Sequence, residues 1–290
     1  MALFKKKKQL DSNSMKNGVG LITVTKPTSS IAEQFRTIRT NVQFSSADRQ
    51  LKTLLFTSAD PSEGKSTISF NVAVTWADQG NKVLLIDSDL RRPTVARSFR
   101  VSNSQGLTTI LTAKQANLSE SIHETEVPNL YVLPSGPVPP NPSELLNSSK
   151  MDQLLKVLKE QFDIIILDVP PVNTVTDAQI LASKVDGVIL VVPQGIAIKG
   201  AVLRARDLLK KVNANLIIDA GLGFVFASNA HNLKGRNFRM QKAFAKLDQH
   251  NGAEMVTWMQ DNAKKIINGD DLEPSEYHYI KEKKKFWLFR

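Results

Sequence analysis

A short segment containing glycine and lysine restricts the folds open to this chain more than any other feature. Residues 59–66 read Ala-Asp-Pro-Ser-Glu-Gly-Lys-Ser, follow the apolar run 54–56 and lead into a segment with the pattern of a helix, 66–78. A strand, such a loop and a helix form a phosphate-binding site, because loop N–H groups and the positive end of the helix dipole face the phosphates. The alternative is an ordinary strand-to-helix turn, but the flanking segments favour a nucleotide site.

Two side chains at the end of this loop have defined tasks in a phosphate-binding site. The Lys65 ammonium reaches the β- and γ-phosphates, and the Ser66 hydroxyl binds Mg²⁺. The motif is the relaxed form, since Ala59 stands where the strict form has glycine. A nucleotide with β- and γ-phosphates and Mg²⁺ are therefore the expected ligands. The residues expected to contact the nucleotide are Asp60, Pro61, Ser62, Glu63, Gly64, Lys65, Ser66 and Thr67.

Three aspartates follow two further apolar segments that are typical of buried parallel strands. The segment 82–86 leads into Asp87 and Asp89, and the segment 162–167 leads into Asp168. Because ligands of open α/β sheets bind outside the carboxyl ends of the strands, we expect these carboxylates beside the phosphate loop. A single aspartate at a strand end is usually a loop cap, but three near one loop favour a metal site. Ser66 is expected to bind Mg²⁺ directly, and Asp89 and Asp168 to hold it directly or through water.

Strand and helix patterns alternate along the chain, as a doubly wound fold requires. We expect an α/β fold with a doubly wound, mostly parallel sheet flanked by helices, in the three-layer, Rossmann-like arrangement of the P-loop NTPases. Further strands are expected at 131–133, 187–192, 216–218 and 223–226, and helices at 31–44, 107–112, 177–184 and 199–211. Another helix runs through Leu154, Leu155 and Leu158, with Ser143 or Ser149 as its N-cap.

Positive charge is concentrated at the two ends of the chain. Of the formal net charge of +10, the four lysines Lys5–Lys8 carry +4, and residues 281–290, with five cations and one acid, carry another +4. A nucleic-acid-binding domain would show a basic stripe on the folded part, so we expect no nucleic acid partner. Basic ends that also carry Phe4, Phe286 and Trp287 suit peripheral contact with an anionic membrane. Two solvated tails are the alternative.

Composition limits the class of protein further. The chain has no cysteine, which excludes disulfides and thiolate metal sites. No apolar stretch approaches the roughly 20 residues of a membrane span, and no apolar signal core follows the basic N-terminus. We expect a cytoplasmic protein with three parts: a basic flexible tail, 1–25; a P-loop domain, 26–230; and a divergent helical or flexible segment, 231–290.

Several motifs resemble those of the bacterial tyrosine kinases that control capsule and exopolysaccharide synthesis. The phosphate loop is followed by Leu-Ile-Asp-Ser-Asp-Leu-Arg-Arg-Pro at 85–93 and by Ile-Leu-Asp-Val-Pro-Pro at 166–171. The proline-rich stretch 136–146 and the Glu-x-x-Arg-x-x-Arg element at 33–39 are also similar to that family. The resemblance spans about residues 26–226, and the Asp-Leu-Arg-Arg-Pro string is its most specific part.

The resemblance implies an ATP- and Mg²⁺-dependent protein-tyrosine kinase that phosphorylates itself and regulates polysaccharide synthesis and export. It implies that Asp87 takes the proton from the tyrosine hydroxyl, with Lys65 as the second catalytic residue. It implies subunit contacts of a homo-oligomer through Glu33, Arg36 and Arg39, although a simple exposed amphipathic helix would explain these residues too. The implied partners are a membrane-bound polysaccharide co-polymerase or adaptor, which would place the kinase at the inner face of the cell membrane, and a cognate tyrosine phosphatase.

The acceptor region departs from the family pattern. Members usually end in a dense tyrosine cluster, whereas this chain has three tyrosines in all; Tyr277 and Tyr279 lie near its end and are the expected autophosphorylation sites. Ala227 stands where we expect an asparagine that reads the adenine. For Arg91 and Arg92 two interpretations stay open, namely binding of a phosphate or partner and pairing with a surface acid.

Three rival functions share this fold. A partition or septum-site ATPase carries lysine at the second position of the loop motif, where this chain has Asp60, and that difference counts against it. A metal-cluster carrier would need cysteines. A catalytically weakened regulator would not need to retain Lys65 and all three aspartates, and their presence therefore favours an active kinase.

Overall fold

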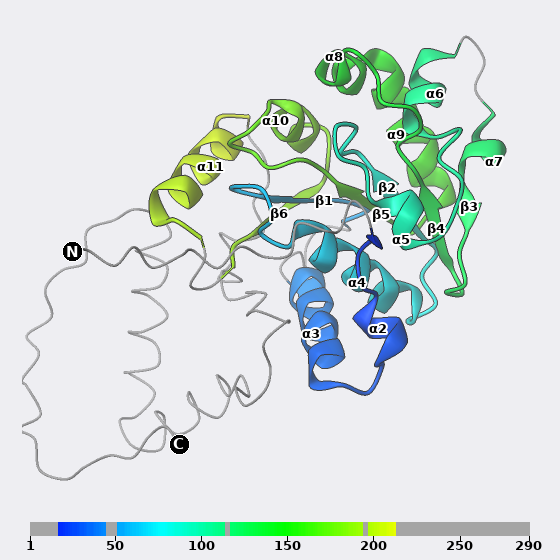
Figure 1. Cartoon of the computed structure of the whole chain (residues 1–290), viewed down its shortest axis with the longest axis vertical. Helices are drawn as coiled ribbons and strands as arrows, with labels where there is room; N and C mark the ends of the chain where they lie inside the picture. Colours follow the sequence, from blue (N-terminus) through cyan, green and yellow to red (C-terminus); the bar gives the residue numbers. More distant parts are fainter. Residues whose placement is uncertain (1–16, 45–50, 114–116, 194–196, 213–290) are drawn as a thin grey trace, which may run out of the picture. The chain divides into compact units, whose positions relative to one another are not determined.

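The structure is a computed structural model that describes residues 17–44, 51–113, 117–193 and 197–212. Figure 1 draws these residues as coloured ribbons. Outside the described residues lie several expected features: the strands 216–218 and 223–226, Ala227, Tyr277, Tyr279, the segment 231–290 and the two basic ends.

Within the described residues, a six-stranded sheet forms the middle layer in the order β3-β4-β2-β5-β1-β6. Neighbouring strands are parallel, except that β3 and β4 are antiparallel. Every residue of β1, β2 and β6 is buried, which explains their continuous aliphatic sequences. The predicted mostly parallel α/β fold is confirmed. The strands are β1 (Thr53–Ser58), β2 (Val83–Asp87), β3 (His123–Glu124), β4 (Leu130–Leu133), β5 (Ile164–Asp168) and β6 (Gly187–Val191).

Helices lie on both faces of this sheet (Figure 1). The helices expected at 107–112 and 199–211 have these bounds, and the other expected helices differ at their ends. Among the described helices, none combines the length and the apolar character needed to span a bilayer. In chain order the helices are α2 (Ile22–Thr25), α3 (Ser30–Phe44), α4 (Lys65–Ala77), α5 (Val95–Ser98), α6 (Leu107–Thr112), α7 (Leu118–Ser121), α8 (Pro142–Asn147), α9 (Ser149–Gln161), α10 (Asp177–Ala182) and α11 (Lys199–Lys211).

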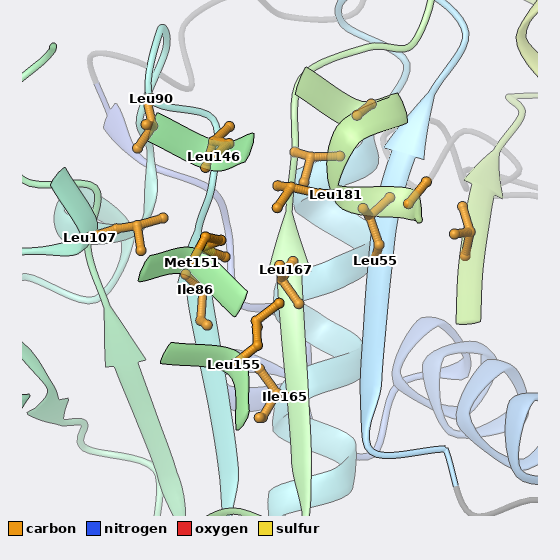
Figure 2. Packing of buried hydrophobic residues seen from close by; sticks show 14 of the residues in the cluster. Leu55, Ile86, Leu90, Leu107, Leu146, Met151, Leu155, Ile165, Leu167 and Leu181 are labelled. Atoms are coloured by element: carbon orange, nitrogen blue, oxygen red, sulfur yellow. The ribbon is translucent and has the colours of Figure 1, made fainter. Parts of the chain in front are cut away.

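One face of the sheet packs against helices α6, α8, α9, α10 and α11. Alternate strand residues such as Leu55, Ile86 and Leu167 point to this face and belong to one hydrophobic cluster with Leu146 of α8 and Leu155 of α9 (Figure 2). Full burial of each such side chain contributes about 1.5–3 kcal/mol to the stability of the folded state, so this layer holds the sheet against the helices. The carboxyl ends of the strands are thereby kept in fixed relative positions.

The other face packs against α3 and α4. Leu54, Phe56 and Leu85 point to this side and meet Phe70 and Trp76 of α4, all of them almost fully buried. Because α4 begins directly after the phosphate loop, this contact fixes the position of the loop relative to the ends of β1, β2 and β5.

The N-terminal boundary of the folded part differs from the sequence prediction. The expected flexible tail reached residue 25, but Val19 and Thr23 are buried. The Val19 N–H donates to Ser98 Oγ over 2.8 Å, and the Thr23 N–H donates to Asn71 Oδ1 over 2.9 Å. The prediction is therefore wrong for residues 17–25, because buried hydrogen-bonding groups on α4 and α5 hold them; the preceding 16 residues lie outside the described part.

The helix expected around Leu154 is also organised differently. Two helices, α8 and α9, replace a single one, and neither Ser143 nor Ser149 is the N-cap. Ser148 lies between the helices with extended backbone angles, φ −67° and ψ 154°, and its side chain accepts a hydrogen bond from the Met151 N–H. A serine in this conformation ends one helix and caps the next, since its hydroxyl satisfies an N–H that would otherwise have no partner.

Candidate functional site

The phosphate loop connects β1 to α4. Gly64 has φ +89°, in the left-handed region, and an added Cβ would meet nothing within 4 Å. Glycine is therefore required here by the backbone conformation and not by space. Ser62 also has a positive φ, 62°, so the loop contains a non-glycine residue in a rare conformation. Such a curled backbone directs successive N–H groups towards one point, as a phosphate site needs.

Glu63 stabilises this loop from inside. Its side chain is buried, and Oε2 accepts a hydrogen bond of 2.9 Å from the Asp60 N–H. The Ser58 hydroxyl donates to the Asp60 carbonyl over 2.8 Å. Burial raises the pKa of Glu63, against the hydrogen bond from Asp60, which lowers it. Glu63, one of the residues expected to contact the nucleotide, thus binds its own loop, because its carboxylate accepts a hydrogen bond from the Asp60 N–H.

Strand pairing brings the three aspartates to the loop. Asp87 and Asp168 are opposite each other in the β2–β5 ladder, and Phe56 of β1 is opposite Asp168 on the other side of β5. The three strands therefore end together, with the phosphate loop following β1. This register places Asp87 and Asp168 beside the loop, as expected. The contact of Asp89 with Lys65 places the third carboxylate there too.

Lys65 lies between two of these carboxylates. Its Nζ is 3.1 Å from Asp89 Oδ2 and 3.3 Å from Asp168 Oδ2. The exposed fractions are 14% for Lys65, 7% for Asp89 and 0% for Asp168. Burial alone would lower the pKa of Lys65, but the charges of Asp168 and Asp89 raise it above its ordinary value. Lys65 thus stays cationic at the point where phosphate charge would arrive.

Asp168 binds two hydroxyl groups of α4. Ser66 Oγ donates to Asp168 Oδ2 over 2.6 Å, and Ser69 Oγ donates to Asp168 Oδ1 over 3.1 Å. Burial raises the pKa of Asp168, and the charge of Lys65 opposes this rise. Sequence reasoning did not include Ser69; the signal was its spacing, since residues three apart lie on the same face of a helix.

Asp87 is fully buried at the end of β2. Its Oδ2 accepts hydrogen bonds of 2.8 Å from the N–H groups of both Thr94 and Val95, so the loop after β2 curls back over the carboxylate. Its Oδ1 is buried and has no hydrogen-bond partner among the described residues. Burial, followed by the charge of Asp168, raises the pKa of Asp87 to about 8. One oxygen of this carboxyl group is thus buried without a hydrogen-bond donor among the described residues.

These groups fit a hard cation that also contacts a phosphate. In the described part of the chain, no three carboxylate, histidine or cysteine side chains are gathered closely enough to hold a metal ion by themselves. Mg²⁺ needs only one or two carboxylates when phosphates and water complete its shell. The Ser66 hydroxyl and the Asp168 and Asp89 carboxylates supply oxygens of the right kind, and Asp87 Oδ1 is a fourth, unpartnered oxygen nearby.

The two neighbouring arginines have different environments. Arg91 Nε is 3.0 Å from Oδ2 of Asp177, a carboxylate with no exposed surface, and a second nitrogen donates to Ser143 Oγ. Pairing with Asp177 raises the pKa of Arg91. The Arg92 N–H donates to Asp89 Oδ1 over 3.0 Å, but its side chain is exposed. Arg91 therefore pairs with an acid, as one interpretation predicted, but this acid is buried and does not lie on the surface.

The three residues expected at a subunit contact do not share one exposed face. Glu33 and Arg36 form an ion pair on the surface of α3. Arg39 is 9% exposed, and one of its guanidinium nitrogens donates to the Thr75 carbonyl of α4 over 2.7 Å. Packing against α4 thus separates Arg39 from the exposed pair of Glu33 and Arg36.

A phosphate loop after the first strand of a parallel sheet, with aspartates at the ends of neighbouring strands, defines a P-loop nucleotide-binding domain. The family model described as an AAA domain matches residues 52–218. Over 197 residues, covering 68% of this chain and 83% of the relative, the sequence is 45% identical to the tyrosine-protein kinase YwqD of Bacillus subtilis (strain 168). The chain belongs to the family of bacterial tyrosine-protein kinases, as its motifs predicted.

Other relatives support the same assignment. The putative tyrosine-protein kinase CapB of Staphylococcus aureus is 45% identical over 192 residues, which cover 66% of this chain and 84% of that protein. The crystal structure of the chimerical protein CapA2B2 has a TM-score of 0.65 at 37% identity, covering 71% of this chain and 94% of that one. The kinase domain of Escherichia coli tyrosine kinase ETK has a TM-score of 0.65 at 33% identity, covering 68% and 77%.

Proposed function

We propose that this protein transfers the γ-phosphate of ATP to tyrosine hydroxyls, with Mg²⁺, and that it regulates the synthesis and export of capsular or extracellular polysaccharide. The observation that carries the proposal is the convergence of Lys65, Ser66 and three buried aspartates at the carboxyl ends of β1, β2 and β5. Family membership supports tyrosine as the acceptor. The septum-site alternative is disfavoured by Asp60 at the second loop position.

Lys65 and the loop backbone bind the phosphates in this proposal. Phosphoryl transfer is mainly positioning and charge stabilisation, so a cation and N–H groups held in place before the reaction are what the site must supply. When bound, Mg²⁺ would neutralise charge on the β- and γ-phosphates. Ser66, Asp168 and Asp89 would hold it, and Ser66 is already at hydrogen-bond distance from Asp168.

Lys65 must change partners during nucleotide binding. In the structure its ammonium contacts Asp89 and Asp168, the two carboxylates proposed to hold the metal. When the lysine turns to the phosphates, both carboxylates lose a cation and become available as metal ligands. Without nucleotide, the Lys65 ammonium therefore pairs with the Asp89 and Asp168 carboxylates. With nucleotide, Lys65 would bind the phosphates and the two carboxylates would bind the metal.

Asp87 is the proposed base. A free tyrosine has a pKa of about 10, so its proton must be collected as the new bond forms. Because burial raises the pKa of Asp87, its ionised carboxylate would accept a proton more readily than an ordinary carboxylate does. Its unpartnered Oδ1 is the atom that would accept the proton, while the Thr94 and Val95 N–H groups keep Oδ2 in place.

The wider assignments rest on the family. We propose a membrane-bound polysaccharide co-polymerase or adaptor as activator, a cognate tyrosine phosphatase, a homo-oligomer with a contact near Glu33 and Arg36, and a cytoplasmic place at the inner membrane face. Tyr277 and Tyr279 are the proposed acceptors within the chain. The basic ends would add peripheral membrane contact.

A transfer assay with the full chain tests the proposal. Purified protein is incubated with labelled ATP and Mg²⁺, with and without a peptide from the cytoplasmic end of the adaptor, and phosphotyrosine is mapped by mass spectrometry. We expect label on tyrosine in the wild type and none in Lys65→Met, while Lys156→Met, which removes an exposed lysine of α9, behaves as the wild type. Label on tyrosine in Lys65→Met, or nucleotide hydrolysis without any phosphotyrosine, would refute the assignment.

A further inference from the structure

Arg92 is an exposed cation in the loop that carries the catalytic carboxylates. Its backbone N–H donates both to the carbonyl of Asp89, over 3.2 Å, and to Oδ1 of Asp89, over 3.0 Å. The other oxygen of Asp89 faces Lys65 at 3.1 Å. Pro93, which follows, restricts Arg92 to an extended backbone. The backbone of Arg92 is therefore tied to Asp89, a residue that contacts Lys65 of the phosphate loop.

The guanidinium of Arg92 has no acid to neutralise it among the described residues. The preceding Arg91 is paired with the buried Asp177, whereas the guanidinium of Arg92 takes part in none of the ion pairs or hydrogen bonds found there. Residues 91–100 contain four arginines and no acidic residue. The loop that encloses Asp87 is thus positively charged on its outer side, and a partner that passes over it would gain from negative charge.

In the proposed mechanism, an acceptor tyrosine comes close to this loop. Its hydroxyl must reach Asp87, whose carboxylate is enclosed by the backbone of residues 94 and 95 in the same loop. Because Arg92 belongs to the same loop and is exposed, residues next to the acceptor tyrosine would come within reach of its guanidinium.

We propose that Arg92 selects acidic tyrosine peptides by pairing with carboxylates beside the acceptor tyrosine. The inference rests on the proposed kinase function and adds the substrate class. The chain itself contains such a peptide: residues 270–280 include four acidic residues, Tyr277 and Tyr279, and no lysine or arginine. Glu276, directly before Tyr277, is the carboxylate best placed in the sequence to meet Arg92. The partner is accordingly an acidic tyrosine segment, here that of a second copy of the chain.

Peptide kinetics with the full chain test this proposal. The substrates are a synthetic peptide of residues 270–280 and a matched peptide in which Glu273 and Glu276 are both glutamine. The enzymes are the wild type, Arg92→Ala and the control Lys156→Ala, which removes an exposed cation of α9. We expect Arg92→Ala to raise KM for the acidic peptide about five-fold, as for a partly exposed ion pair, with kcat and KM for ATP unchanged. The glutamine peptide should show the raised KM with every enzyme. The difference in KM for the acidic peptide between the wild type and Arg92→Ala should shrink at high salt.

A charge exchange gives the second measurement. Arg92→Glu should phosphorylate the acidic peptide worse than Arg92→Ala does, and a peptide with Glu276→Lys should restore part of the loss. If Arg92→Ala and the wild type use both peptides with the same KM, the inference fails although the kinase function stands. If Arg92→Ala instead raises KM for ATP, Arg92 binds nucleotide and the inference is wrong. If the wild type phosphorylates neither peptide nor its own tyrosines, the proposed function fails and the inference with it.

Discussion

Replacing Lys65 by methionine should destabilise the protein without nucleotide, in addition to abolishing transfer. The Lys65 ammonium neutralises Asp89 and Asp168 at 3.1 Å and 3.3 Å, and those side chains are 7% and 0% exposed. Methionine has a similar length but no charge, so two largely buried carboxylates would lose their cation.

The size of the effect follows from the burial of the partners. Two unit charges about 4 Å apart attract each other by about 4 kcal/mol at an effective dielectric constant of about 20, and removing one partner of a buried pair usually costs about 3–5 kcal/mol. Some exposure of Lys65 and hydrogen bonds from Ser66 and Ser69 to Asp168 reduce this cost. We expect a loss of about 2–3 kcal/mol in the free energy of unfolding, or about 5–10 °C in Tm.

Urea unfolding followed by circular dichroism measures this loss, with Lys156→Met as the charge control. Adding Asp168→Asn to Lys65→Met should recover about 1 kcal/mol, because a neutral amide needs no counter-charge while its oxygen can still accept a hydrogen bond. If Lys65→Met unfolds at the same urea concentration as the control, the ion pairs contribute nothing, and the argument from burial is refuted.

Three further predictions concern other parts of the fold. Asp87→Asn should retain ATP binding, measured by calorimetry, but slow single-turnover transfer by about 10²–10⁴-fold, the usual range for a lost general base; an unchanged rate would remove Asp87 from that role. Asn71→Ala should lower the free energy of unfolding, measured in urea, by about 2–4 kcal/mol. The buried Asn71 side chain accepts a hydrogen bond from Thr23 and donates to the carbonyls of Gly20 and Thr67. A loss below about 1 kcal/mol would mean that Asn71 does not hold the N-terminal segment. Burial raises the pKa of Asp186, but hydrogen bonds from Lys159 and Thr53 outweigh it and lower the pKa below its ordinary value. The contribution of Asp186 to stability is therefore complete above the pKa of the unfolded state and is lost as pH falls through the pKa of the folded state. Asp186→Asn should then flatten the acid side of the curve of unfolding free energy against pH. Equal slopes for the wild type and the variant would contradict this.

Features that depend on residues close together in the sequence could be predicted from the sequence alone. The aliphatic content of the segments around 54–56, 83–86 and 164–167 indicates buried parallel strands, because such strands are apolar on both faces. The loop chemistry of Gly64, Lys65 and Ser66 is contained in consecutive residues. With parallel strands, the position of Asp168 at a strand end was enough to place it beside the loop.

Features that depend on contacts between distant segments were decided by the tertiary structure. No local pattern distinguishes Arg91, which pairs with Asp177, from the exposed Arg92, or shows that α4 covers Arg39. The same holds for the N-terminal segment, whose polar groups bind Asn71, 48 positions away from Thr23. Helical or strand periodicity indicates which face of an element is apolar. It does not say which polar group of another element will lie opposite, because that depends on how the sheet orders its strands and places each helix against them.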